Sequence, residues 1–321
     1  MKIYRAPAKY LMYSVPLVLI IGFFVGLKWD TSFLKSTLMY GTITMIYATM
    51  IGINFKSLLS TKGMKVVTSA MLVNFIAIPL ITIAIGFLFL KDYPGLYAGL
   101  ALLALLPTSG MTIAWTRLQN ANGEAAVKMT VIGLLLGAVL TPVYLYFMLD
   151  GADVEFEFFG IMKTILIVVL VPLILGHLTY KLILTKYTPQ EFNQNIKKKF
   201  NPLSIWAMLY VVFVSISNGA EQIKNNLGLI VIAALVLLLF YAILFAMSTG
   251  IALRFFIRND GIAFVNGTAL RNLSIAMGLA ATSFGAEAAL LVTLSFIIQQ
   301  QLIAMYVSIS QNRWFNEKNF N

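Results

Sequence analysis

The sequence predicts an all-α polytopic membrane protein with ten transmembrane helices, and three observations lead to this fold class. Hydrophobic residues make up 60% of the 321 positions and charged residues only 11%, less than half the charged share of a typical soluble domain. Ten apolar runs each come close to the length of about 20 residues that crosses a bilayer as a helix. The connections between these runs alternate between cation-rich and cation-poor.

The predicted spans follow the apolar runs in order along the chain. The first run comes after three cations and has no small-residue cleavage site behind it, so we expect a span and not a signal peptide. The seventh run is short and the eighth is long. The ten ranges are 10–27, 36–54, 66–90, 95–116, 125–149, 159–181, 203–218, 227–256, 261–283 and 286–310.

The distribution of lysine and arginine predicts the orientation of the chain. These cations, Lys128 among them, gather in every second connection when the N-terminus is placed in the cytoplasm, while most acids fall outside. Because cytoplasmic loops carry an excess of cations, both termini are expected in the cytoplasm, with the plasma membrane as location and lipid as a partner. The polar connection from Thr185 to Pro202 is expected at the cytoplasmic surface. The net charge of +11 therefore calls for no nucleic-acid partner.

The residue types that are missing exclude several kinds of chemistry. The chain has no cysteine and one histidine, His177, which excludes disulfides, thiolate nucleophiles and clusters of cysteine or histidine around a metal. No P-loop or zinc signature is present. We therefore expect a protein that is not an enzyme and that has no cofactor, with a sodium ion as the one candidate.

The two halves of the chain resemble each other, which predicts an inverted repeat. The run Thr112-Ile113-Ala114 precedes Gly-Glu-Ala-Ala at 123–126, and the run Ser274-Ile275-Ala276 precedes Ala-Glu-Ala-Ala at 286–289. An odd number of spans in each half gives the halves opposite orientations, as in many secondary transporters. The predicted repeats are residues 1–150, with spans 1–5, and residues 151–321, with spans 6–10.

Spans 4 and 9 are interrupted at matching depths. Span 4 contains Pro-Thr-Ser-Gly at 107–110, where proline removes a hydrogen-bond donor and glycine loosens the helix. Span 9 contains Asn-Gly at 266–267 and then Arg271, near the middle of an apolar run. No acid lies at that depth, so either backbone carbonyls or a bound anion must neutralise Arg271. Paired interruptions predict a substrate site at the midplane, whereas a simple proline kink and a snorkelling arginine are the alternative.

These motifs resemble those of the bile acid:sodium symporter superfamily, which includes arsenite-efflux permeases and organic-anion carriers. Residues 107–111 (Pro-Thr-Ser-Gly-Met) and 115–118 (Trp-Thr-Arg-Leu) are similar to the arsenite permeases. Residues 269–276 (Ala-Leu-Arg-Asn-Leu-Ser-Ile-Ala) lie where the superfamily has a Gln-Asn or Asn-Asn pair. The resemblance implies a panel domain of spans 1, 2, 6 and 7 and a core domain of spans 3–5 and 8–10, in which broken helices 4 and 9 cross.

The chain departs from the superfamily pattern at several functional positions. The arsenite permeases have a cysteine directly after the span-4 proline, where this chain has Thr108, and a hydroxyl is a poor substitute for a soft thiolate ligand. Thr268 and Arg271 stand where the sodium symporters have a Glu and a Gln that hold sodium. A fixed cation there repels a sodium ion, so at least one sodium site is expected to be lost. A residual sodium site would use Ser109, Thr112, Asn272 and Thr268, although Ile113 replaces another family ligand.

The leading functional prediction is a secondary transporter that moves a small organic anion by alternating access. Half-helix N-termini at the two breaks would present N–H groups to the anion. Arg271 would pair with the anion or pin the crossing as a built-in cation in place of sodium. Of the glutamines Gln299, Gln300 and Gln301, at least one should face the core, as a substrate ligand or as an interhelical hydrogen-bonding group, and Asn74 is expected to be structural. The predicted substrate-binding residues are Arg271, Asn272, Thr108, Ser109, Thr112, Ser274, Gln299 and Gln300.

Two other functions are weighed against this one. An arsenical-resistance efflux permease is disfavoured because cysteine is absent. A channel or sensor would show a ring of like polar residues around an oligomer, and no such element is evident. The identity of the substrate, the direction of transport and the oligomeric state are left open by the sequence.

Overall fold

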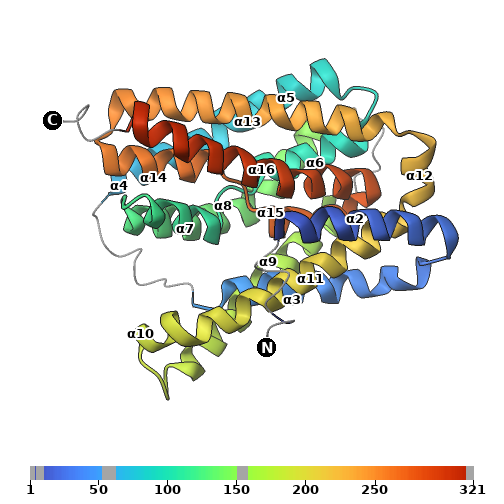
Figure 1. Ribbon diagram of the computed structural model, residues 1–321, viewed down its shortest axis with the longest axis horizontal. Coiled ribbons are helices and arrows are strands. Elements are labelled where there is room, and N and C mark those ends of the chain that lie inside the picture. The colour runs from blue at the N-terminus through green and yellow to red at the C-terminus, as the bar shows by residue number, and fades with distance from the viewer. Residues whose placement is uncertain (1–3, 5–10, 53–62, 150–157, 316–321) are drawn as a thin grey trace.

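The computed structural model describes residues 4, 11–52, 63–149 and 158–315, and the segments between them are left undescribed. Over these residues the chain is almost wholly helical, and its one β-bridge joins Pro107 to Arg271. Figure 1 shows the helices lying roughly along one direction. Most of the two terminal segments lies outside the described residues, as do residues 53 and 54 of the predicted second span.

Helices account for most of the described residues in each of the first five predicted ranges. The third range forms one continuous helix with a π-helical turn, η3, inside it, and the fourth is broken in two at residues 106–109. The elements are α2 (Leu11–Lys28), η1 (Ser32–Thr37), α3 (Leu38–Met50), α4 (Met64–Leu72), η3 (Val73–Ala77), α5 (Ile78–Phe89), α6 (Pro94–Leu105), α7 (Gly110–Leu118) and α8 (Gly123–Leu149).

Helices also cover the last five predicted ranges, with one boundary that differs. The seventh helix begins at Lys197 and not at residue 203, because a π-helical turn leads the polar connection directly into it. The elements are α9 (Phe158–Ile183), α10 (Pro189–Glu191), η4 (Phe192–Ile196), α11 (Lys197–Asn218), α12 (Ala220–Asn225), α13 (Gly228–Phe255), α14 (Arg258–Ala269), α15 (Leu273–Leu279), η5 (Ala280–Phe284) and α16 (Gly285–Arg313).

Several of these helices are long and apolar enough to cross a membrane. Among the described residues, five segments meet both conditions, and three further apolar helices are shorter. One of the shorter helices is α6, which stops at a break and needs α7 to complete a crossing. The five long segments are Met64–Phe89, Gly123–Leu149, Met162–Ile183, Gly228–Phe255 and Leu273–Ser310.

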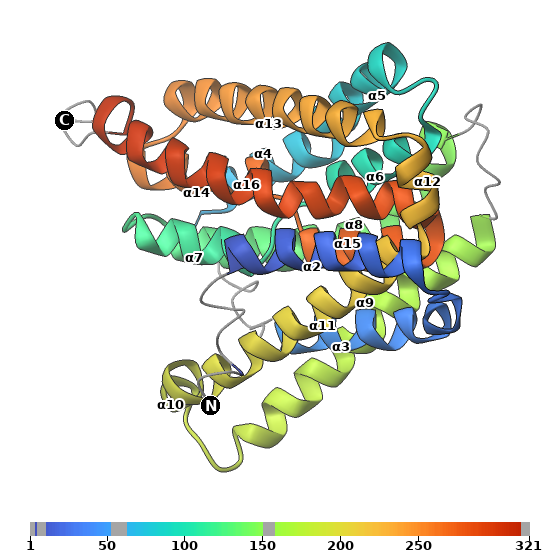
Figure 2. The ribbon, with the colours of Figure 1, turned by 45° about the vertical axis from the view of Figure 1, so that its right-hand side comes forward.

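The helices pack in two groups. In one group α11 lies against α2 and α3, and α3 lies against α9. In the other, α16 packs on α6 and α13, α13 packs on α14, and α8 packs on α6, α7 and α14. Figures 1 and 2 both place α3, α9, α10 and α11 along one side of the molecule and α13, α14 and α16 along the other. The broken pairs α6–α7 and α14–α15 lie within the second group.

Sequence alone accounts for the break between α6 and α7. Pro107 has no N–H and disfavours helical geometry at the residue before it, so α6 ends at Leu105 and Leu106 leaves the helical region with ψ at 74°. Thr108 then turns the chain with a φ of +59°. The second break, at residues 270–272, has no proline, so its cause must lie in the contacts that surround it.

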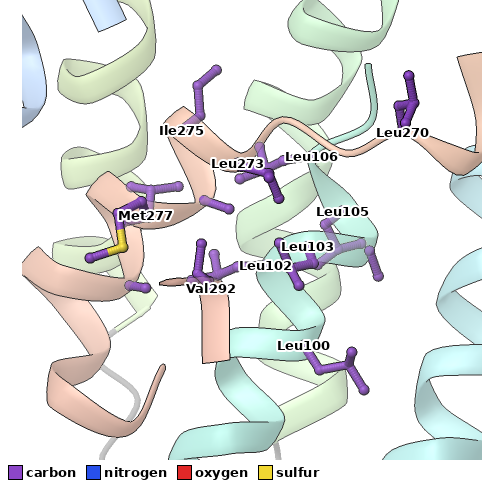
Figure 3. Close-up of a cluster of buried hydrophobic side chains, with 14 of the residues drawn as sticks. Leu100, Leu102, Leu103, Leu105, Leu106, Leu270, Leu273, Ile275, Met277 and Val292 are labelled. Atoms are coloured by element: carbon purple, nitrogen blue, oxygen red, sulfur yellow. The ribbon is translucent and has the colours of Figure 1, made fainter. Parts of the chain in front are cut away.

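Apolar side chains enclose the place where the two breaks meet. Figure 3 shows them projecting from α6, α15 and α16 around the unwound links. Backbone groups in such surroundings have no water to bond with, so each must find a partner inside the protein. The enclosing residues, all buried, are Leu100, Leu102, Leu103, Leu105, Leu106, Leu270, Leu273, Ile275, Met277 and Val292.

Candidate functional site at the crossing of two broken helices

The two unwound links pair with each other like short antiparallel strands. The backbone N–H of Thr108 donates to the carbonyl of Leu270 at 3.1 Å, and the N–H of Asn272 donates to the carbonyl of Leu106 at 2.8 Å. Arg271 stands opposite Pro107 in the bridge between these two bonds. The pairing satisfies backbone groups that neither half-helix can satisfy alone, and it fixes the links side by side. This crossing confirms the interruption predicted in span 4 and, in span 9, the one at Arg271, whereas Asn266 and Gly267 stay helical within α14.

The guanidinium of Arg271 binds the carbonyl ends of both broken helices. The side chain is 0% exposed. Its Nη1 donates to the carbonyl of Ala104 at 3.0 Å and its Nη2 to the carbonyl of Thr268 at 2.7 Å. These carbonyls lie in the last turns of α6 and α14, where the helix dipole carries its negative end. Arg271 therefore neutralises two helix C-termini at once.

The side-chain amide of Asn74 is a further hydrogen-bond partner of the Arg271 guanidinium. Nη2 also donates to Oδ1 of Asn74, and Nδ2 of the same amide donates to the carbonyl of Gly267 at 2.9 Å. Asn74 lies in the π-helical turn η3. Among the described residues, no carboxylate reaches Arg271, and its Nε has no hydrogen-bond partner. Carbonyl oxygens, one of the two expected alternatives, stabilise this cation in the structure, and because they are uncharged dipoles the net positive charge of Arg271 remains.

Gln299 is the glutamine that faces the crossing. Its Oε1 accepts the backbone N–H of Arg271 at 2.8 Å and the hydroxyl of Tyr241 at 3.0 Å. The Tyr241 hydroxyl also lies 2.6 Å from Oγ of Ser295. The neighbouring Gln300 is only partly buried. The amide oxygen of Gln299 is thus engaged in interhelical bonds, and Tyr241, which links α13 to α16, is a site residue that sequence reasoning missed.

The N-terminus of α7 is capped by two of the predicted site residues. Ser109 Oγ accepts the N–H of Met111 at 3.2 Å, and the N–H of Ser109 donates to Thr112 Oγ1 at 3.2 Å, which together form a capping box. Thr112 also donates to the carbonyl of Asn266 at 3.3 Å, which ties α7 to α14. Ser109 is partly exposed, whereas Thr112 is buried.

The N-terminus of α15 is built in a similar way. Asn272 is the N-cap, and its Oδ1 accepts the N–H of Ile275 at 3.3 Å. Ser274 lies in the first turn and is partly exposed. The crossing therefore brings together two helix N-termini, which favour anions, and two helix C-termini, which favour cations.

Thr108 is buried against α8 and does not face open space. Its hydroxyl donates to the carbonyls of Pro107 at 2.8 Å and Met129 at 3.3 Å, and the side chain is buried. A β-branched residue with positive φ is a true backbone outlier, worth about 1–3 kcal/mol of strain. The surrounding bonds hold Thr108 in this conformation, so here its role is to shape the turn at the break.

The predicted residual sodium ligands are engaged by the protein. The hydroxyl of Thr268 donates to Oγ of Ser248 at 2.7 Å and to the carbonyl of Phe264 at 2.8 Å, so it is directed toward α13. Ser109 and Asn272 cap their helices, and Thr112 bonds to α14. The backbone carbonyl of Thr268, and not its hydroxyl, accepts a hydrogen bond from the cation at the crossing, the guanidinium of Arg271.

A second buried cation, Lys128, corrects the assignment of this lysine to a cytoplasmic connection. Its side chain is 0% exposed in α8, and Nζ lies 3.0 Å from Oε1 of Glu124, a side chain that is 45% exposed. The count of charges in connections cannot separate a lysine in a loop from one in the first turns of the next helix. No other signal in the sequence marks Lys128.

Known proteins have sequences similar to most of this chain. A family model described as Sodium Bile acid symporter family matches residues 38–226, a stretch that includes α6 and α7 and ends before α14. The uncharacterized protein YbaS of Bacillus subtilis is 23% identical over 294 residues, 90% of this chain and 91% of its own length.

Two further relatives are arsenical-resistance proteins. The arsenical-resistance protein Acr3 of Corynebacterium glutamicum is 21% identical over 266 residues, 78% of this chain and 70% of its own length. The arsenical-resistance protein Acr3 of Alkaliphilus metalliredigens is 25% identical over 197 residues, 57% and 54% of the respective lengths.

Proposed function

The chain belongs to the sodium bile acid symporter family, and we propose that it moves a small organic anion by alternating access, with Arg271 in place of a coupling sodium ion. Members of this family are transporters, so the chain is a secondary transporter and not an enzyme, as the sequence predicted. It is a multi-pass membrane protein.

The proposal assigns the helices to an inverted repeat. Residues 1–150 and 151–321 would form two five-span repeats, with α2, α3, α9 and α11 as the panel domain and the remaining spans as the core domain. The packing of α11 on α2 and α3, and of α3 on α9, supports this division. Both termini would lie in the cytoplasm of a cell whose plasma membrane holds the protein, with the lipid bilayer and the transported anion as its partners.

One observation carries the proposal, namely the guanidinium of Arg271 at two helix C-termini. Carbonyl oxygens that converge in this way are suited to a bound cation, and here the chain supplies that cation covalently. A sodium ion about 4 Å away would be repelled by about 4 kcal/mol at an effective dielectric constant of about 20. Transport is therefore expected to proceed without a sodium gradient.

The same arrangement favours an anion as substrate. Arg271 has no carboxylate partner among the described residues, so its positive charge is felt by any group that enters the crossing. The capped N-terminus of α7 adds a positive dipole end beside it. Ser109 and Ser274, both partly exposed, are proposed as direct hydrogen-bond donors to the anion, with Gln300 as a further candidate.

The other predicted substrate ligands form hydrogen bonds that stabilise the crossing of the two broken helices in this structure. Thr112, Asn272 and Gln299 cap or bridge the broken helices, and Thr108 forms the turn. We propose that they position Arg271 and the helix ends, and that the anion is attracted mainly by the charge and dipoles that they hold in place.

Arsenite is the second substrate to consider, because two relatives are named arsenical-resistance proteins. Arsenite binding by thiolates needs soft sulfur ligands, and the chain has no cysteine. The position after Pro107 is a threonine whose hydroxyl is turned to the backbone of α8. These features favour an organic anion with oxygen donors over arsenite.

The decisive experiment is uptake into proteoliposomes that contain the purified full-length chain. A thermal-shift screen against carboxylates, sulfonates and oxyanions would first select substrates, and labelled uptake would then be measured with sodium or potassium as the only external cation. We expect saturable uptake with counterflow at equal rates in both salts. Strict dependence on sodium would contradict the role given to Arg271, and flux without saturation or counterflow would indicate a channel.

A further inference from the structure

A groove lined by hydrocarbon side chains lies where α2, α11, α12, α13 and α16 converge. It encloses about 190 Å³, and its nine lining residues are all leucine, isoleucine or phenylalanine. A cavity of about 150 Å³ with the same kinds of lining residue stays dry and binds small hydrocarbons such as benzene. The groove is therefore suited to an apolar occupant and not to water.

The groove has a buried floor and an exposed rim. Its floor includes Ile216 of α11, Ile223 of α12 and Leu290 of α16, which are 0%, 2% and 1% exposed. On the rim, Ile20 and Phe24 of α2 are 51% and 64% exposed. Figures 1 and 2 both show α2 alongside α16, and the two helices are in contact. Since α2 packs with the first group of helices and α16 with the second, the groove lies on the seam between the groups.

Two close contacts hold the helices around the groove in place. A Cβ on Gly26 of α2 would stand 2.0 Å from the carbonyl oxygen of Ser217 in α11. A Cβ on Gly219, which caps α11, would stand 2.0 Å from the Cβ of Ala286 in α16. Only glycine permits such approaches. They fix α2 on α11, and α11 on α16, through faces that do not line the groove, so α2 is not free to move in and fill it.

The groove has the depth of one leaflet of the bilayer. Phe24 and Leu19 precede Lys28, the last residue of α2, by four and nine positions. At 1.5 Å per residue these positions are about 6 and about 14 Å from Lys28 along the helix, and one leaflet of the hydrocarbon core is about 15 Å thick. Leu227, which precedes α13, lines the groove at the same end as Phe24. The groove thus runs along the direction in which acyl chains lie.

A cation and an aromatic ring lie at the end of the groove that faces the bilayer surface. Nζ of Lys28 is 4.8 Å from the centre of the Trp29 ring, and Trp29 is 57% exposed. Exposed tryptophan is typical of the boundary between membrane and water. Lys28 follows Phe24 by four positions, so it lies one turn farther along the same face of α2. Among the described residues, no carboxylate lies within ion-pair distance of Lys28, so its ammonium can pair with a phosphate.

We propose that this groove binds one phospholipid, with an acyl chain between α2, α13 and α16 and the phosphate at Lys28. The lining supplies the apolar surface, the depth matches one chain, and the cation stands where a headgroup would be. Because the walls come from both groups of helices, the bound chain would fasten α2 to α16 across the seam. This lipid is separate from the transported anion, so the inference can hold or fail independently of the proposed function.

Photolabelling of the full-length chain in proteoliposomes tests where the acyl chain lies. Phosphatidylcholine vesicles would contain a trace of phosphatidylglycerol with a diazirine in the middle of one chain, and labelled residues would be located by mass spectrometry. Leu80 and Phe87 of α5 are the control for Ile20 and Phe24, because they are more exposed, at 61% and 75%. We expect more label on the α2 pair than on this control, and label on the buried Leu290. Labelling that follows exposure, with none on Leu290, would overturn the proposal.

Filling the groove tests whether the bound lipid matters for stability. Ile20→Trp places an indole in the groove, whereas Leu80→Trp makes the same change on α5. Native mass spectrometry should find one retained phospholipid fewer in the Ile20 variant than in the wild type and the control. Phospholipid added to delipidated protein should raise the melting temperature of the wild type and the control, and this rise should be lost in the Ile20 variant. The same rise and the same retained lipid in all three proteins would refute the proposal.

Replacing Lys28 tests the headgroup end without disturbing the packing, since this side chain is exposed. Lys28→Gln should weaken the binding of phosphatidylglycerol about fivefold, the equivalent of about 1 kcal/mol for one cation near a membrane surface. Lys35→Gln is the matched control, because it removes the same charge from another exposed position. Titration of the delipidated proteins with phosphatidylglycerol, followed by native mass spectrometry, gives both affinities. Equal weakening in the two variants, or none in either, would contradict the placement of the phosphate at Lys28.

Discussion

Arg271 donates a hydrogen bond from Nη1 to the carbonyl oxygen of Ala104, at 3.0 Å and across 167 positions of the chain. Its other terminal nitrogen bonds to the carbonyl of Thr268, three positions earlier. One side chain thus closes the ends of a helix from the first half and a helix from the second. Four predictions follow from this site and from the other buried cation.

Replacing Arg271 tests both stability and transport. Arg271→Gln would leave helix-terminal carbonyls of α6 and α14 unpaired, so we expect a loss of about 3 kcal/mol in stability and the loss of anion uptake. Arg271→Lys keeps the charge but cannot reach three acceptors in a planar fork, so it should be intermediate in both respects. Thermal unfolding in detergent and uptake into proteoliposomes would be measured together. Uptake by the glutamine variant at the wild-type rate would remove Arg271 from the mechanism.

Asn74→Asp tests whether the charge of Arg271 attracts the substrate. Aspartate has the shape of asparagine and keeps the oxygen that accepts from Nη2, but it adds a negative charge beside the guanidinium. We expect a KM for the anion that is about tenfold higher, equivalent to about 1.4 kcal/mol of binding free energy. Asn74→Ala, as the control, removes the amide without adding charge and should mainly lower the melting temperature. Equal KM values for aspartate and wild type would count against electrostatic attraction.

Gln299→Leu should destabilise the crossing more than the same change at Gln300. The first substitution leaves the buried N–H of Arg271 without an acceptor, which costs about 1–3 kcal/mol. Gln300 is the matched control, because it lies on the same helix and is only partly buried. Melting temperatures of the two variants in the same detergent give the comparison. A similar decrease for both would mean that the Gln299 bonds contribute little.

Lys128→Leu should leave stability unchanged or increase it. In the predicted repeat the counterpart of Lys128 is the buried Leu291, which makes leucine the natural substitute at this buried position. Lys128→Leu leaves no buried charge unpaired, because the Glu124 side chain is 45% exposed and stays in contact with water, and replacing buried ionic groups by apolar ones is often neutral or stabilising by about 1–4 kcal/mol. Glu124→Gln should instead destabilise, because it leaves the buried ammonium of Lys128 without its carboxylate. Loss of folding in the leucine variant would show that Lys128 has a structural role as a cation.

Much of the fold could be predicted because bilayer thickness sets the length of each apolar run. Helices account for most of the described residues of all ten predicted ranges, and the break after Leu105 follows from Pro107. A buried cation without an acid could also be predicted, since no Asp or Glu lies near the middle of an apolar run. These features depend on short stretches of sequence, where hydropathy and proline act locally.

The rest of the site depends on contacts between distant residues. The break between Ala269 and Leu273 has no proline; it is held by the backbone bonds of the crossing and by the Asn272 cap. Which glutamine turns inward is decided by the rotation of α16 against α13. The orientation of the Thr108 hydroxyl follows from a positive φ that no pattern in the sequence marks. Such details need the packed structure.

The strand-like pairing at the crossing has a mechanical consequence. Because Thr108 is bonded to Leu270 and Asn272 to Leu106, neither interrupted helix can tilt or slide while the other stays still. The two interruptions are therefore expected to move together as one rigid unit inside the apolar core. Relative motion of the two groups of helices is then expected at contacts farther out, such as the contact of α3 with α15. A transporter built in this way would keep the geometry of its substrate-binding site unchanged throughout the transport cycle, while the surrounding helices move.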